Sequence, residues 1–278
     1  MTKFENSLEK KFKVAAIQFC ANEEKEENLQ FISRLIDTAV ENDVDIVVLP
    51  EMFNCCGRIE AMIENAEKIP GYTTNLLSEK ARRFKICIVC GSIFEKFQKD
   101  KVFNTSVLVG RSGEILAKYS KIHLFDVDIL NKIRYKESDH VLAGNRLVTV
   151  NMGQFDAGLV ICYDLRFCEL FRVLTLKGAK IFFVPAAFTA ATGKYHWEPL
   201  IKARAIENQV FIVAANQIGT SPNNITCYGK SMIVDPWGKV LAKAKDNENI
   251  IYAEVDLSLL ETIRAEIPLF KHRRTDLY

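Results

Sequence analysis

The sequence predicts a layered α/β fold, because strand-like segments alternate with helical ones through most of its 278 residues. Two of the strand-like segments, Asp45–Pro50 and Lys180–Pro185, are almost entirely apolar. Such runs are typical of strands that are covered on both faces. At 49% hydrophobic residues the chain can bury a large core, and no linker rich in proline, glycine or serine divides it. We therefore expect a single domain over residues 1–278.

In the first half of the chain, the helix expected at 26–42 shows the clearest pattern, because its apolar residues recur at helical spacing. The other expected helices are 58–68 and 74–84, and the expected strands are 13–19, 45–50, 86–94, 102–109 and 115–119. The segment 120–144 is polar and aromatic and has no clear period. Long irregular segments inside a compact domain are often functional.

The second half continues the alternation. The expected strands are 147–150, 154–161, 180–185, 210–215, 231–235, 239–244 and 250–255, and the expected helices are 164–177, 195–207 and 258–265. The chain then closes with an aromatic and basic tail, which begins near residue 266 and includes Pro268–Tyr278. We expect this tail to pack on a neighbouring subunit.

The charge balance excludes several classes of function. With 37 basic and 35 acidic residues the net charge is +2, too small to favour nucleic acid or an anionic membrane surface. The charged N-terminus lacks the apolar core of a signal peptide, and no apolar stretch approaches the roughly 18 residues of a membrane span. The eight cysteines are irregularly spaced, as is usual for reduced thiols. We expect a cytoplasmic protein.

Three chemically active side chains stand directly after predicted strands. Glu51 follows the apolar run ending at Pro50, Lys121 follows the strand at 115–119, and Cys162 follows the strand at 154–161. In open α/β sheets, ligands bind outside the carboxyl ends of the strands. A carboxylate, an ammonium and a thiol at such an edge are the parts needed to attack a carbonyl carbon covalently. The sequence therefore predicts a thiol hydrolase.

Each of these residues also has a plainer interpretation. Cys162 could be a structural cysteine at the end of a buried strand, Glu51 a capping or loop carboxylate, and Lys121 a solvent-facing lysine. In the functional interpretation, a helix starting near Asp164 presents its amides to Cys162 and lowers the pKa of the thiol. The backbone N–H of Tyr163 then stabilises an oxyanion.

The surrounding motifs resemble those of the nitrilase, or carbon–nitrogen hydrolase, superfamily. Glu51, Lys121 and Cys162 occur in the family's order, separated by 70 and 41 residues. The matching segments are Leu49-Pro-Glu51-Met-Phe, Tyr119-Ser-Lys121-Ile-His, Ile161-Cys162-Tyr-Asp-Leu-Arg166-Phe, Pro185-Ala-Ala-Phe188, Gly193-Lys-Tyr-His-Trp197, Arg204-Ala-Ile-Glu207 and Asp235-Pro-Trp-Gly238. The resemblance covers roughly residues 13 to 278.

Within that superfamily the chain is most similar to the Nit branch and its omega-amidases, through Lys121-Ile-His-Leu-Phe-Asp126 and Lys136-Glu137-Ser138. The resemblance implies a four-layer αββα sandwich that forms homodimers or larger assemblies through its helical faces. It also implies that Glu51 is the base and Cys162 the nucleophile of a thioester mechanism. Lys121 and Tyr163 N–H would then stabilise the oxyanion, while Glu137 orients Lys121 and the substrate amide.

The implied substrate is a small amide that also bears a carboxylate, such as 2-oxoglutaramate or 2-oxosuccinamate. Arg166 is the candidate for binding that carboxylate, since a guanidinium fork fits it well; its alternative role is an ion pair behind the site. Phe188 and Thr192 are candidates for the pocket wall. Where omega-amidases carry a tyrosine-containing loop, this chain has Cys55-Cys56-Gly57-Arg58, so one substrate contact is expected to be missing.

Other functions remain open at this point. Deaminated glutathione, N-carbamoyl amino acids and N-carbamoyl amines are alternative substrates, and a catalytically silent binding protein is an alternative of another class. A redox role for Cys87 and Cys90 is a further alternative, although strand alternation would place the two on opposite faces. Neither this pair nor the adjacent Cys55 and Cys56 suits tetrahedral ligation. We expect no metal and no cofactor.

Overall fold

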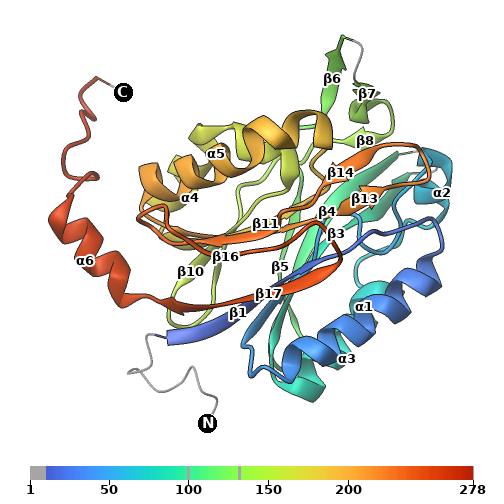
Figure 1. Cartoon of the computed structure of the whole chain (residues 1–278), viewed down its shortest axis with the longest axis horizontal. Helices are drawn as coiled ribbons and strands as arrows, with labels where there is room; N and C mark the ends of the chain where they lie inside the picture. The colour runs from blue at the N-terminus through green and yellow to red at the C-terminus, as the bar shows by residue number, and fades with distance from the viewer. Residues whose placement is uncertain (1–10, 99–100, 131–132, 278) are drawn as a thin grey trace.

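The computed structural model describes residues 11–98, 101–130 and 133–277. Within these residues the chain forms two large sheets that pack face to face and are covered by helices (Figure 1). No helix in the described ranges is long and apolar enough to cross a membrane. The helices are α1 (Lys25–Val40), α2 (Ile59–Glu64), α3 (Tyr72–Phe84), α4 (Cys168–Leu176), α5 (Ala190–Asn208) and α6 (Ser258–Glu266).

The first sheet contains seven strands of the described chain. They are β1 (Lys11–Gln18), β2 (Ile46–Val48), β3 (Cys87–Gln98), β4 (Lys101–Val109), β5 (Ile115–Ser120), β8 (Val141–Leu142) and β17 (Asn249–Asp256). Their order is β17-β1-β2-β3-β4-β5, with β8 paired to β4. The central strands β1, β2 and β3 are parallel, so their carboxyl ends meet at one edge.

The second sheet contains six strands of the described chain. They are β9 (Thr149–Asn151), β10 (Asp156–Leu159), β11 (Ala179–Ala186), β12 (Phe211–Asn216), β15 (Met232–Val234) and β16 (Val240–Lys243), in the order β16-β15-β12-β11-β10-β9. Here too the central strands β10, β11 and β12 are parallel. Each sheet therefore brings the ends of parallel strands to a common edge.

The alternation of side chains along β1 shows how the layers are built. Val14 and Ala16 belong to the core between the two sheets, whereas Ala15 and Ile17 pack towards α1 and α3. On the other side, Phe171 of α4 contacts Phe182 of β11, with ring centroids 4.7 Å apart. Helices α1 and α3 thus cover one sheet, and α4 and α5 cover the other (Figure 1). The fold is the predicted four-layer αββα sandwich.

Two hairpins differ from the sequence-based expectation. The segment 120–144, expected to be irregular, contains β6 (Asp126–Ile129) paired with β7 (Ile133–Lys136), then a short 3-10 turn and β8. A second hairpin, β13 (Ile218–Thr220) with β14 (Thr226–Tyr228), was not expected at all. Both pairs consist of very short strands and bury little on one side, so their hydrophobic pattern is weak.

Helix boundaries also differ at functionally important positions. The helix expected at 164–177 begins only with α4 at Cys168, because residues 162–166 form a separate 3-10 turn. Helix α5 begins at Ala190, five residues before the expected start, and α2 is shorter than expected. The remaining expected elements lie within a few residues of their predicted ranges.

The C-terminal tail is anchored at its beginning on its own subunit. The Gln209 side-chain amide donates to the Ile267 carbonyl at 2.7 Å, and the guanidinium groups of Arg172 and Arg264 lie over the Phe270 ring. Beyond Phe270 most of the described tail is exposed. Tyr278, which is part of the predicted subunit contact, lies outside the described residues. Packing of the tail on a neighbouring subunit stays a prediction.

Candidate active site

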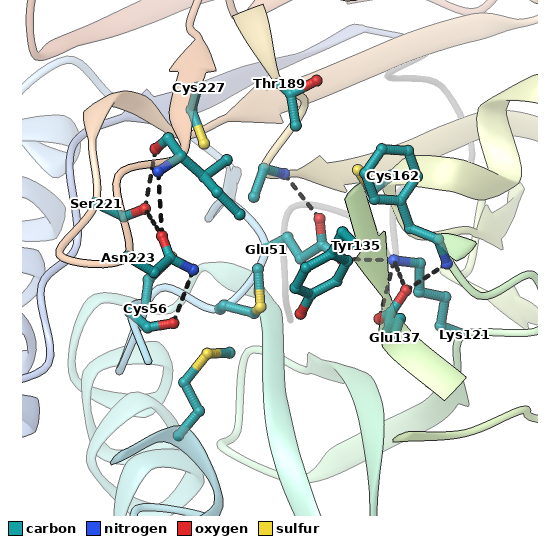
Figure 2. A pocket seen from close by; sticks show the side chains of 16 residues that line it. Glu51, Cys56, Lys121, Tyr135, Glu137, Cys162, Thr189, Ser221, Asn223 and Cys227 are labelled. Atoms are coloured by element: carbon teal, nitrogen blue, oxygen red, sulfur yellow. Dashed lines mark hydrogen bonds and ion pairs between the residues drawn. The ribbon is translucent and has the colours of Figure 1, made fainter. Parts of the chain in front are cut away.

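The three sequence-predicted side chains and Glu137 line one pocket at the carboxyl ends of the strands (Figure 2). Glu51 comes from the loop after β2, Lys121 directly follows β5, and Cys162 follows β10 of the second sheet. Glu51 and Lys121 are each 2% exposed, Glu137 5% and Cys162 8%. Residues far apart in the sequence therefore meet in a cleft between the two sheets, where their side chains are buried.

The Lys121 ammonium is held between two carboxylates. Its Nζ lies 3.0 Å from Glu51 Oε1 and 2.9 Å from Glu137 Oε2. The Asn104 side-chain amide on β4 donates to both carboxylates, at 2.9 Å to Glu51 and 3.2 Å to Glu137. The backbone carbonyl of Asn104 also accepts from Lys121 N–H at 2.8 Å. Asn104 was not predicted from the sequence, since it lies in the middle of a strand without a motif of its own.

Backbone amides complete the solvation of the carboxylates. Ala187 N–H, directly after β11, donates to Glu51 Oε2 at 2.8 Å, and Phe125 N–H donates to Glu137 Oε2 at 2.7 Å. The Gln217 side chain donates to the Glu51 carbonyl at 3.0 Å. Buried carboxylates need such partners because an unpaired charge is costly in a dry site. The network therefore fixes both carboxylates before any substrate arrives.

The charge of Lys121 is stabilised by this arrangement. Burial on its own would lower its pKa, but the negative charges of Glu137 and Glu51 outweigh burial and raise the pKa well above the ordinary value. Lys121 is therefore an ammonium at any physiological pH. A fixed positive charge beside Cys162 is suited to stabilising an oxyanion.

The Cys162 thiol is neutral in this site. Burial raises its pKa well above the ordinary value, the Glu51 carboxylate raises it further, and Lys121 offsets only part of these effects. The expectation that a helix N-terminus favours the thiolate is wrong, because α4 starts six residues after Cys162. Cys162 instead opens the 3-10 turn with a φ of 45°. The thiol must consequently lose its proton to a base during the reaction, and Glu51 is adjacent.

The turn that carries Cys162 is held by the buried carboxylate of Asp164. It accepts hydrogen bonds from Tyr119 Oη at 2.6 Å, His123 Nδ1 at 2.8 Å and His123 N–H at 3.1 Å. It also accepts from Ile161 N–H at 2.9 Å. Asp164 thereby ties the Cys162 turn in the second sheet to the Lys121 segment in the first. Its place in the Cys-Tyr-Asp motif was the only sequence signal for this role.

The predicted substrate-binding residues line a second, adjoining pocket. Tyr163, Arg166, Phe188 and Thr192 surround it together with Cys162. The two pockets also share lining residues on either side of the thiol: Phe125, Ala187 and Thr189. All eight residues singled out from the sequence therefore line these two pockets, four of them the main pocket and five the second, with Cys162 common to both.

The surroundings of Arg166 bear on its two alternative roles. Its guanidinium lies 5.0 Å from the Phe188 ring centroid and 5.6 Å from that of Tyr163, and its Nη1 lies 3.1 Å from His196 Nδ1. Among the described residues no carboxylate lies within ion-pair distance of it. Its buried Nε has no hydrogen-bond partner in the described chain. This cation is therefore available to an anionic ligand that enters the second pocket.

The remaining cysteines are not paired with one another in the described chain. All eight cysteines are free thiols. Cys87 and Cys90 belong to different cores on opposite faces of β3, as strand alternation predicted. Groups of three or more side chains suited to holding a metal ion are absent from the described residues. Cys56 and Cys227 line the main pocket, where burial raises the pKa of both thiols.

The αββα fold thus holds a thiol and a carboxylate–ammonium cluster in one pocket, the groups expected of a hydrolase. A family model described as carbon-nitrogen hydrolase matches residues 13–265, and the chain belongs to this family. Omega-amidase NIT2-A of Xenopus laevis is 40% identical over 268 residues, covering 96% of this chain and 97% of that protein.

Solved structures agree with this assignment. The C. elegans NitFhit protein matches with a TM-score of 0.90 at 36% identity, covering 96% of this chain and 66% of NitFhit. Saccharomyces cerevisiae Nit3, a member of branch 10 of the nitrilase superfamily, matches with a TM-score of 0.87 at 34% identity, covering 97% of this chain and 98% of Nit3. The chain is accordingly a carbon–nitrogen hydrolase of the Nit type.

Proposed function

We propose that this enzyme is an omega-amidase, which hydrolyses the terminal amide of a small dicarboxylic acid monoamide to the acid and ammonia. One observation carries the proposal: Lys121, held by Glu51 and Glu137, borders the same pocket as the Cys162 thiol. The omega-amidase relative, at 40% identity over nearly the whole chain, supports this choice of substrate class.

In the first half-reaction, Glu51 accepts the thiol proton as the Cys162 sulfur attacks the amide carbon. The negative charge that develops on the amide oxygen is stabilised by Lys121 and by the backbone N–H of Tyr163. Glu51 then returns the proton to the nitrogen, the carbon–nitrogen bond breaks, and ammonia leaves. Glu137 holds Lys121 in position and orients the substrate amide. The product of this half is a thioester on Cys162.

In the second half-reaction, water takes the place of ammonia. Glu51 removes a proton from the water as its oxygen attacks the thioester carbon, and the same oxyanion donors act again. The carbon–sulfur bond breaks, the sulfur recovers its proton, and the carboxylic acid is released. No electron acceptor or cofactor is required by this sequence of steps.

Arg166 is proposed to bind the carboxylate at the far end of the substrate. Its lack of an ionic partner among the described residues favours this role over the ion-pair alternative. Phe188 and Thr192 then form the wall beside the acyl chain. The Cys55–Arg58 loop contributes Cys56 and Gly57 to the pocket and contains no tyrosine, so no phenol from that loop reaches the substrate.

Ammonia release from a panel of amides tests the proposed function. We expect the wild-type enzyme to hydrolyse 2-oxosuccinamate and 2-oxoglutaramate faster than deaminated glutathione or N-carbamoyl amino acids. Cys162→Ala abolishes the release, whereas Cys168→Ala, at an exposed thiol outside both pockets, retains it. Hydrolysis that survives Cys162→Ala would overturn the mechanism. A preference for deaminated glutathione or a carbamoyl compound would replace the proposed substrate.

We further propose a single-domain, cytoplasmic homodimer that associates through the α4–α5 face and the C-terminal tail. Exposed apolar side chains on this side of the molecule support the proposal: Val173, Leu176, Ile206 and Ile267. Sedimentation of the full chain and of an Ile206→Glu variant tests it. A wild type that is monomeric, or a variant with an unchanged oligomeric state, would contradict this interface.

A further inference from the structure

Strand β7 places an additional side chain in the main pocket. Along β7 the side chains alternate, so Arg134 and Lys136 are largely exposed whereas Tyr135 faces inward. Tyr135 shares its side of the chain with Glu137, two residues further on, and both line the pocket. Figure 2 shows the Tyr135 ring among the side chains of Glu51, Lys121 and Glu137. The β6–β7 hairpin therefore supplies a phenol as well as a carboxylate.

The Tyr135 hydroxyl has no hydrogen-bond partner among the described residues. The fully buried Tyr119, by contrast, donates to Asp164 at 2.6 Å. Burial and the Glu137 charge raise the pKa of Tyr135, so its hydroxyl keeps its proton. The pocket thus contains a neutral donor that is not engaged by the protein.

Two other polar side chains that line the main pocket, Ser221 and Asn223, already bond to the protein. Ser221 Oγ donates to the Ile225 carbonyl at 2.9 Å, and Asn223 Nδ2 donates to the Gly57 carbonyl at 3.0 Å. The facing side chains of Met52 and Met62 are apolar. In this part of the pocket, Tyr135 is therefore the group best placed to recognise an oxygen atom of a ligand.

Tyr135 also lies close to the proposed carboxylate pocket. The Phe125 ring borders both pockets, with its centroid 6.2 Å from that of Tyr135 and 5.1 Å from that of Tyr163. A short acyl chain attached at Cys162 can therefore lie between Tyr135 on one side and Arg166 on the other. With the amide at Cys162 and the carboxylate at Arg166, the remaining polar atom of a 2-oxo acid amide is its 2-oxo oxygen. That oxygen can accept a hydrogen bond from a neutral donor.

We propose that Tyr135 determines specificity by donating a hydrogen bond to the 2-oxo oxygen of the substrate. This inference rests on the proposed omega-amidase function and extends it, because Arg166 would bind any monoamide that bears a carboxylate. Tyr135 distinguishes the 2-oxo acid amides from their saturated analogues. In effect, a phenol from β7 supplies a substrate contact where the Cys55–Arg58 loop supplies none.

The test compares 2-oxosuccinamate with succinamate, which differ only in the 2-oxo oxygen. We expect the wild-type enzyme to favour 2-oxosuccinamate. In Tyr135→Phe, kcat/KM for 2-oxosuccinamate falls about 3- to 10-fold, the range of one neutral hydrogen bond, while the value for succinamate is unchanged. Tyr195→Phe, at an exposed tyrosine on α5, is the matched control and keeps the wild-type preference. Thermal unfolding verifies that each variant is folded.

The outcomes separate this inference from the proposed function. Parallel losses for both amides in Tyr135→Phe, or a wild type without preference for the 2-oxo compound, overturn the role of Tyr135 alone. An enzyme that cleaves neither amide overturns the omega-amidase function and this inference with it. A loss of kcat/KM confined to 2-oxosuccinamate supports both the omega-amidase function and the role of Tyr135. Arg166→Met serves as the contrast, because it is expected to impair both substrates.

Discussion

Replacing Lys121 by methionine tests the buried charge cluster most severely. The substitution roughly keeps the side-chain volume but removes the ammonium between Glu51 and Glu137, which lies 3.0 and 2.9 Å from their oxygens. Breaking a buried ion pair from one side costs about 3–5 kcal/mol, because the remaining charge is left without its partner. With an unfolding entropy of about 2.1 cal/mol/K per residue, this loss corresponds to a Tm decrease of about 5–9 °C for a chain of this size.

The Tm decrease in Lys121→Met is expected to depend on pH, which ties it to the buried charges. In the wild type the raised pKa of Lys121 means that its stabilising contribution is fully present at neutral pH and is lost only as the pH rises through that raised pKa. In Lys121→Met, two carboxylates share a site without a cation, so acid restores stability by protonating one of them. Differential scanning calorimetry at pH 5 and pH 8 should therefore show the larger Tm difference at pH 8. Lys11→Met, at an exposed pair with Glu254, is the control. A Tm equal to wild type at pH 8 would refute the reasoning.

Two further substitutions probe the proton transfers and the turn. Glu51→Gln removes a charge that raises the pKa of Cys162, so the pH midpoint of Cys162 alkylation should move down. The rate of amide hydrolysis should fall by about 10²–10⁴-fold, because the base is lost. An unchanged midpoint would show that Glu51 and Cys162 are not coupled. Asp164→Asn weakens four hydrogen bonds that hold the Cys162 turn. We therefore expect the free energy of unfolding, measured in urea, to fall by about 2–4 kcal/mol, and kcat to be lower. Wild-type stability and kcat in this variant would contradict the anchoring role of Asp164.

The sequence patterns were sufficient for an α/β fold and for the residues that follow its predicted strands, whereas the four-layer arrangement was implied by the family resemblance. Buried parallel strands such as β11 have a strong hydrophobic signal, and their carboxyl ends define where ligands bind. The sequence therefore predicts that Glu51, Lys121 and Cys162 lie at one edge of the fold. The residue types alone made a thiol hydrolase the natural hypothesis.

Residues that act through tertiary contacts could not be found in this way. Asn104 lies within β4, and its bridge between Glu51 and Glu137 exists only after the strands have assembled. Tyr135 lies in a hairpin whose alternation extends over only a few residues, too short to distinguish from a loop. The extended backbone of Phe167 separates the 3-10 turn at Cys162–Arg166 from α4, and no sequence pattern indicated this interruption.

The central claim is that Cys162, at the junction of the two pockets, is the nucleophile on which all hydrolysis depends. Titration with iodoacetamide, followed by peptide mass spectrometry and ammonia assays on the same samples, tests it directly. We expect activity to fall in proportion to alkylation of Cys162 and to reach zero at one equivalent on that residue, whatever the modification of exposed Cys168. Activity that persists after full alkylation of Cys162, or that follows the modification of another cysteine, would contradict it.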